Sequence, residues 1–248
     1  MRIKKGKFLI LISSFFLLNF RFAAADSGSI HGFVKFPGET PPTEMFANRE
    51  ASDCPHGILQ NHLIVDQRRR GLKNAVILLE SDDRIDPVDR RATLSSDDCT
   101  LVPRIQSALI GTSLTLTSHG GAAHRIHAYR NGATAFVVDL TEPGVSVRRP
   151  LLERGFYKIN CDKHLWERAW IYVSDNPYTA ISDAQGYFTI TGIPSGRYSL
   201  RAWHEGWAEA DKDPAGRVEY VPEIEVLPVT IKFKRTTEIE FNELQPTP

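Results

Sequence analysis

The chain is poor in the residues that bind metals or cross-link chains, with three cysteines and two methionines among 248 residues. Beyond the first 25 residues it has no helix-length stretch with a 3.6-residue apolar period, which excludes a helical bundle. The chain has no excess of basic residues, since its 30 Lys and Arg residues equal its 30 Asp and Glu residues. We therefore expect no nucleic-acid partner.

The first 25 residues have the pattern of a secretory signal peptide. A basic start precedes an apolar run from Phe8 to Leu18, and small residues end at Ala25. Because the apolar run is too short to span a bilayer, we expect cleavage after Ala25 and no transmembrane segment in the mature chain. Removing residues 1–25 leaves 25 basic and 30 acidic residues, so the expected periplasmic or secreted protein is mildly acidic.

Three cysteines cannot all pair with one another, although exported cysteines are normally oxidised in pairs. Cys54 and Cys99 lie in polar, turn-like surroundings, whereas Cys161 ends an alternating run with His164 nearby. We therefore expect a Cys54–Cys99 disulfide and a free Cys161 thiol, which needs a reason to persist in an oxidising compartment.

Short alternating runs bounded by Gly, Pro, Asn and Asp recur throughout and indicate an all-β chain. The segments 36–73 and 204–216 are expected to be loops. Strands are predicted over 29–35, 74–80, 101–109, 113–118, 124–129, 134–140, 155–161, 169–174, 186–191, 197–203, 217–226 and 229–241, the last with a break near residues 235–237.

Two separated segments resemble the opening and the close of a carboxypeptidase regulatory-like β-sandwich. The opening is GSIHGFVKFPGETPP with GLKNAVILLE, and the close is NPYTAISDAQGYFTITGIPSGRYSLRAWHEGW. The stretch between them is too long for a loop in a compact domain, so it should be a folded insertion. We expect a discontinuous regulatory-like (transthyretin-like) sandwich over 26–94 and 176–248, and an inserted domain over 95–175.

The insertion has about seven predicted strands and a cysteine and histidine at one end, which suggests a cupredoxin-like sandwich. Its segments CTLVPRI, HRIHAY and CDKHLWERAWIYVS resemble exported cupredoxin-like proteins of the methylamine utilisation type. This resemblance implies one copper per chain, single-electron transfer rather than catalysis, and a redox partner such as a cytochrome c or another envelope electron carrier.

Cys161 and His164 can supply two ligands of a copper site from one short loop, and a third must come from another strand. In HRIHAYR a period of two places His124, Ile126 and Ala128 on one face, and this apolar face should meet the core. His124 is therefore the expected third ligand. His127 and His119 are weaker candidates, with His127 expected on the strand surface near the site.

The resembling family has a methionine three residues after the loop histidine, where this chain has Glu167, and commonly Pro-His where this chain has Pro103-Arg104. Glu167 either binds the metal axially or points to solvent. A non-redox binding or scaffold module with a degenerate site is the alternative function. Two other interpretations fit the sequence less well. A structural zinc site prefers four strong ligands, and the sequence offers three and a carboxylate. A cysteine peptidase would need a group to orient its histidine, and the sequence shows none.

Overall fold

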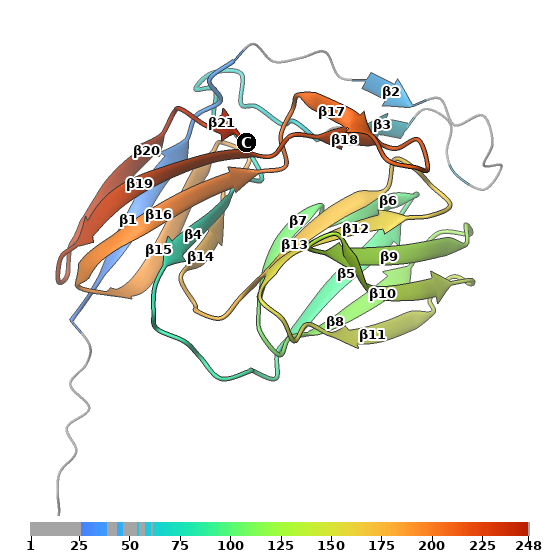
Figure 1. The fold of residues 1–248 in the computed structure, drawn as a ribbon, viewed down its shortest axis with the longest axis horizontal. Coiled ribbons are helices and arrows are strands. Elements are labelled where there is room, and N and C mark those ends of the chain that lie inside the picture. Colours follow the sequence, from blue (N-terminus) through green and yellow to red (C-terminus); the bar gives the residue numbers. More distant parts are fainter. Residues whose placement is uncertain (1–25, 39–43, 47–53, 55–57, 61, 248) are drawn as a thin grey trace, which may run out of the picture.

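The structure is a computed structural model that describes residues 26–38, 44–46, 54, 58–60 and 62–247. The expected signal peptide and its cut after Ala25 lie outside this part. The described residues contain strands and no α-helix, which confirms the all-β fold class. Within the same ranges, no helix is long and apolar enough to cross a membrane. Figure 1 shows two β-sandwiches side by side as separate lobes.

The first sandwich packs a three-stranded sheet on a five-stranded one. The smaller sheet has the order β15 (Tyr187–Pro194), β1 (Ser27–Val34) and β20 (Thr236–Phe241). The larger has the order β14 (Thr179–Ile181), β4 (Val76–Glu80), β16 (Gly196–His204), β19 (Glu223–Ile231) and β21 (Gln245–Pro246). Alternate residues of β1 are buried in the apolar core between the sheets, as a period of two requires.

The second sandwich is built wholly from strands between β4 and β14. One sheet has the order β10 (Ala133–Leu140), β9 (His124–Arg130), β12 (Gly155–Cys161), β13 (Arg168–Ser174) and β7 (Ile105–Leu109). The other has the order β11 (Ser146–Pro150), β8 (Ser113–Ser118), β5 (Arg91–Asp97) and β6 (Thr100–Val102). Because β5 already pairs with β8 from Arg91, the expected domain boundary at residue 95 falls inside this strand.

Several strands lie where the sequence predicts none. β5, β11 and β14 are absent from the predicted set, and β17 (Glu209–Lys212) lies in the expected loop 204–216. The small hairpin of β2 (Glu44–Phe46) and β3 (Ile58–Gln60) lies in the expected loop 36–73. The predicted strand 101–109 is divided into β6 and β7, which belong to different sheets. Pro103 stands between them and cannot donate a ladder hydrogen bond.

A two-stranded ribbon joins the two sandwiches. β17 pairs with β18 (Val218–Tyr220), and Figure 1 shows this ribbon leaving the first sandwich to lie over the second. Glu219 of the ribbon forms ion pairs with Lys158 of β12 and with Arg168 of β13. Arg168 also donates to the carbonyl oxygen of Val218 at 2.6 Å. The ribbon therefore contacts β12 and β13, the two strands that the loop after Cys161 connects.

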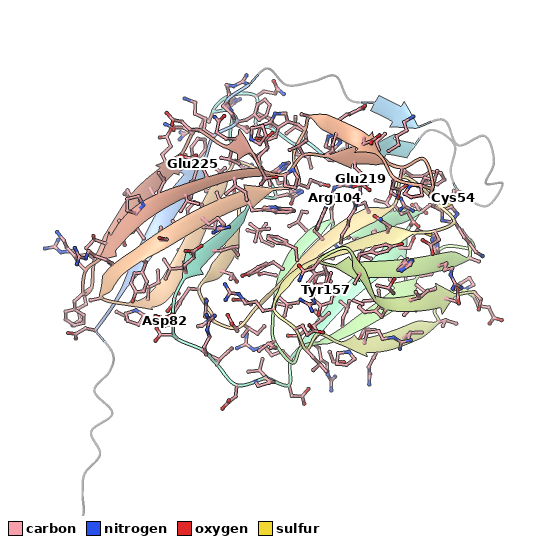
Figure 2. The ribbon with its side chains drawn as sticks, in the orientation of Figure 1. Cys54, Asp82, Arg104, Tyr157, Glu219 and Glu225 are labelled. Atoms are coloured by element: carbon pink, nitrogen blue, oxygen red, sulfur yellow. A yellow bond between two sulfur atoms is a disulfide. The ribbon has the colours of Figure 1, made fainter. Side chains whose placement is uncertain are left out.

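A second set of contacts lies directly between the sandwiches. Val76 and Trp203 of the first pack against Ile105 and Tyr172 of the second. Nearby, the guanidinium of Arg104 donates two hydrogen bonds to the carboxylate of Glu205, at 2.6 and 2.8 Å. Figure 2 shows Glu219 at the top of the second lobe, beneath the ribbon, and Arg104 on the side toward the first lobe. Arg104, which stands where the resembling family has a histidine, is therefore committed to this inter-sandwich ion pair.

Candidate metal centre

Four donor side chains meet at one end of the second sandwich, each delivered by a strand end or a turn. His124 begins β9 and Cys161 ends β12, two neighbouring strands on which Cys161 pairs with Ile126. His164 and Glu167 lie in the loop that joins β12 to β13. The sequence candidates for the site are therefore brought together, although they are up to 43 residues apart in the chain.

The donor atoms of these four residues form one compact group. The Nδ1 atoms of His124 and His164 are 3.1 Å apart, and Sγ of Cys161 lies 3.9 Å from the first and 3.6 Å from the second. Oε2 of Glu167 is 2.8 Å from Nδ1 of His124 and 3.2 Å from Nδ1 of His164. All four ligand atoms lie within 4.8 Å of one another.

The N···N separation of 3.1 Å and the shorter S···N separation of 3.6 Å are close to the edges of a tetrahedral metal site, whereas the 2.8 Å between Glu167 and His124 is a hydrogen-bond distance. Metal–nitrogen bonds of about 2.0 Å and metal–sulfur bonds of about 2.3 Å give tetrahedral N···N edges of about 3.3 Å and N···S edges of about 3.6 Å. The side chains are also shielded from water, with exposures of 0% for Cys161, 1% for His124 and Glu167, and 4% for His164. The arrangement fits a single metal ion with a thiolate, two imidazoles and a carboxylate as ligands.

Backbone hydrogen bonds close the loop that carries three of the ligands. The amide of Cys161 donates to the carbonyl of Glu167 at 3.2 Å, and the amide of Glu167 donates to the carbonyl of His164 at 3.0 Å. From the ribbon, the guanidinium of Arg217 donates to the carbonyl oxygen of Cys161 at 2.8 Å. Since the loop backbone is held at both ends, the donor atoms are positioned by the fold and not by the metal alone.

The electrostatics of the site favour a bound cation. Burial raises the pKa of Glu167, but hydrogen bonds with His124, His164 and Ser96 outweigh it and bring the pKa down to about 2. Burial raises the pKa of the Cys161 thiol to about 12, with the negative charge of Glu167 adding to the effect. A metal cation next to the sulfur would favour the thiolate over the thiol, because cysteine ligands are deprotonated on metal binding.

Ser96 belongs to this site and was missed by the sequence analysis. Its hydroxyl donates to Oε1 of Glu167 at 2.6 Å and lies 3.2 Å from Nε2 of His124. It comes from β5 of the opposite sheet, in a serine-rich stretch that has the composition of a turn. It lies on the same buried face of β5 as Leu94, two residues earlier, but no strand is predicted here from the sequence.

The other histidines in the described ranges lie outside the four-residue group. His127 is on the outer face of β9, with Nε2 2.8 Å from the Thr134 hydroxyl and Nδ1 2.8 Å from the Tyr129 hydroxyl. His119 is exposed and pairs with Asp97. His204 is fully buried near Trp207 and its pKa is lowered to about 4, mainly by burial.

The expected disulfide is present, and it lies against the site. Cys54 and Cys99 are bonded to each other, and Cys161 is free and buried. Sγ of Cys54 lies 3.5 Å from Nε2 of His164, the ring nitrogen that faces away from the other donors. Trp166, half-buried, covers the same histidine with ring centroids 5.2 Å apart and donates to the carbonyl of Cys99 at 2.9 Å.

No family model matches the chain, and no curated protein sequence matches it. Solved structures with a similar fold include cupredoxins. A purple cupredoxin from Nitrosopumilus maritimus is 23% identical with a TM-score of 0.30, covering 34% of this chain and 99% of that one. A copper-containing nitrite reductase from Thermus scotoductus is 16% identical with a TM-score of 0.32, covering 37% of this chain and 24% of that one. A Cu(I) form of an amicyanin variant is 13% identical with a TM-score of 0.31, covering 40% of this chain and 98% of that one.

These structural neighbours are cupredoxins or contain copper. The methylamine utilisation type and the regulatory-like identity of the first sandwich stay predictions from sequence resemblance.

Proposed function

We propose that the chain is an exported copper protein that carries single electrons through a site made by Cys161, His124, His164 and Glu167, and that it is not an enzyme by itself. The convergence of these four buried donor atoms carries the proposal. A soft thiolate with two imidazoles suits copper. When bound, copper would supply a one-electron couple between its +2 and +1 states.

The protein would contribute a preorganised and dry setting for this couple. Ser96 and the backbone bonds of the 161–167 loop hold the ligand atoms in place. Ligands held by such outer contacts move little when the charge of the metal changes, because their own hydrogen bonds resist displacement. The chain therefore favours fast electron exchange over binding and release of a substrate.

A redox partner would approach at the 161–167 loop. Leu165, 37% exposed, and the half-buried Trp166 follow His164 in the sequence and present apolar surface there. Transient electron-transfer contacts are small, so a patch of this size suits a carrier such as a cytochrome c.

Voltammetry of the copper-loaded protein tests the proposal. Wild-type protein should show a reversible one-electron couple, and Cys161→Ser should lose it while its far-ultraviolet circular dichroism stays unchanged. Bound copper without any reversible couple in the wild type would refute the electron-transfer function.

A second candidate is a non-redox module whose site holds zinc, and Glu167 favours it. Its carboxylate lies among the other donors at 2.8 and 3.2 Å from the two imidazoles, so the site offers a fourth strong ligand that zinc accepts. Competition between Zn²⁺ and Cu(I) for the apoprotein separates the two functions. Retention of zinc against an excess of Cu(I) would support the structural role.

Glu167→Met should raise the reduction potential of the copper site. A carboxylate adds negative charge next to the metal and stabilises Cu(II), whereas a thioether is neutral and softer. Glu167→Gln is the matched control, since it removes the charge and keeps the shape. If wild type and both variants have equal potentials, Glu167 is not a ligand in the loaded protein.

A further inference from the structure

The imidazole of His164 stands between two groups of donor atoms. Its Nδ1 atom belongs to the four-residue site, 3.6 Å from Sγ of Cys161. Its Nε2 atom points the other way and lies 3.5 Å from Sγ of Cys54. A single ring therefore connects the proposed copper site to the disulfide.

The disulfide side of this ring is a second cluster of metal-ligand atoms. One ligand atom each from Cys54, Cys99 and His164 lie within 4.8 Å of one another, and all three residues are buried. Ala122 and Trp166 pack around the two cysteines and give the cluster an apolar wall. Figure 2 shows Cys54 at the upper edge of the second sandwich.

The redox state of the cysteines decides whether these atoms can bind a metal. In the disulfide the sulfurs are bonded to each other and carry no negative charge. A dithiol reductant donates two electrons and two protons: the Cys54–Cys99 bond breaks, two thiols form, and the reductant becomes a disulfide. Two thiols beside an imidazole nitrogen are soft ligands of the kind that select Cu(I).

We propose that reduction of the Cys54–Cys99 disulfide creates a second metal site, in which the two cysteines bind one Cu(I) and Nε2 of His164 completes the coordination. On binding, both thiol protons and the proton on Nε2 pass to solvent, and the copper stays in the +1 state. The disulfide thus sets the copper capacity of the chain, which is one ion when oxidised and two when reduced.

The number of Cu(I) ions bound per chain tests this proposal. Mature protein is used as isolated or after treatment with a dithiol and anaerobic removal of the reductant, and Cu(I) is titrated against a colorimetric chelator. Wild type should bind one ion when oxidised and two when reduced. The double variant Cys54→Ser, Cys99→Ser should bind one under both conditions.

Cys161→Ser separates the two sites and keeps the disulfide intact. It should bind no Cu(I) when oxidised and one when reduced, and this ion should protect two thiols from alkylation, as counted by mass spectrometry. If oxidised wild type binds none and reduced wild type binds one with the same protection, the proposed function fails and the second site stands. Reduced wild type that binds no more ions than oxidised wild type, or reduced Cys161→Ser whose thiols stay unprotected, would overturn the second site.

Discussion

Two buried serines, Ser182 in the first sandwich and Ser96 in the second, have different kinds of hydrogen-bond partner. In the first, the Ser182 hydroxyl accepts from the amide of Ala75 at 2.8 Å and donates to the carbonyl of Leu72 at 2.7 Å, so it completes backbone hydrogen bonding. In the second, the Ser96 hydroxyl donates to the buried carboxylate of Glu167, which also contacts His124 and His164. Polar groups that satisfy the backbone stabilise a fold, whereas a buried cluster of ionisable side chains costs desolvation energy. The buried cluster around Glu167 therefore indicates a functional site at this end of the second sandwich.

The comparison assumes that the core of the second sandwich is packed as tightly as that of the first. Truncating one buried leucine in each core tests this assumption. Leu79→Ala in β4 and Leu116→Ala in β8 each truncate a side chain that is at most 2% exposed. Each should lower the free energy of unfolding by about 2–5 kcal/mol, measured by denaturant titration. Val226→Ala, at a position 48% exposed, is the control and should change it by less than about 0.5 kcal/mol. A cost well under 1 kcal/mol for Leu116→Ala alone would indicate a loose second core.

The two faces of β9 give a sharper comparison within the site. His124→Ala removes an inward donor and should lower copper affinity by at least about 100-fold, measured by chelator competition. His127→Ala removes an outward histidine that bonds Thr134 and Tyr129, and should change the affinity little. The reverse result would show that the outer histidine is the ligand.

The ribbon contact to the Cys161 loop tests whether the first sandwich supports the site of the second. Arg217 is 4% exposed, pairs with Asp213 at 2.7 Å and donates to the Cys161 carbonyl. Arg217→Met removes the guanidinium donor from Oδ2 of Asp213 and from the carbonyl oxygen of Cys161, and should cost about 1–3 kcal/mol of unfolding free energy. Arg148→Met, at an exposed position of β11, should have almost no effect. Equal stabilities for the two variants would mean that the ribbon does not hold the loop.

A pH-dependent effect is expected from a buried carboxylate of the first sandwich, Glu223. Burial raises the pKa of Glu223 from 4.5 to about 7, and its Oε2 atom has no hydrogen-bond partner within the described part of the chain. The folded state therefore binds more protons than the unfolded state between these values, so stability falls as pH rises from about 4.5 to 7. Glu223→Gln should lack this decline, with the difference visible in denaturation midpoints at pH 5 and pH 8. Parallel pH profiles would show that the carboxylate is solvated.

Local alternation was enough to predict many of the strands and the inner face of His124, whereas the grouping of Cys161, His164 and Glu167 with it came from the family resemblance. β1 and β8 alternate regularly because one face of each meets a core. His124 could be assigned to the inner face by the same period. β11 was missed because both of its faces are at most half-buried, and its sequence SVRRP has no apolar alternation.

The contacts that the sequence could not predict are those between distant segments. Ser96 reaches Glu167 across the sandwich, and Cys54 reaches His164 over 110 residues. The stretch around Cys99 was read as a turn, and Asp98 and Cys99 do have positive φ angles of 46° and 58°. What the pattern of a turn does not reveal is which buried ring its disulfide will contact, because that depends on how the two sheets pack.

The most direct test of the four-residue copper site is a Cu(II) titration of the oxidised mature protein followed by visible absorption. An intense thiolate-to-copper band should grow linearly and stop at one copper per chain. The band should be absent from Cys161→Ser and strongly weakened in His124→Ala and His164→Ala, with His127→Ala resembling the wild type. Saturation with copper without such a band, or an unchanged band in Cys161→Ser, would contradict the assignment.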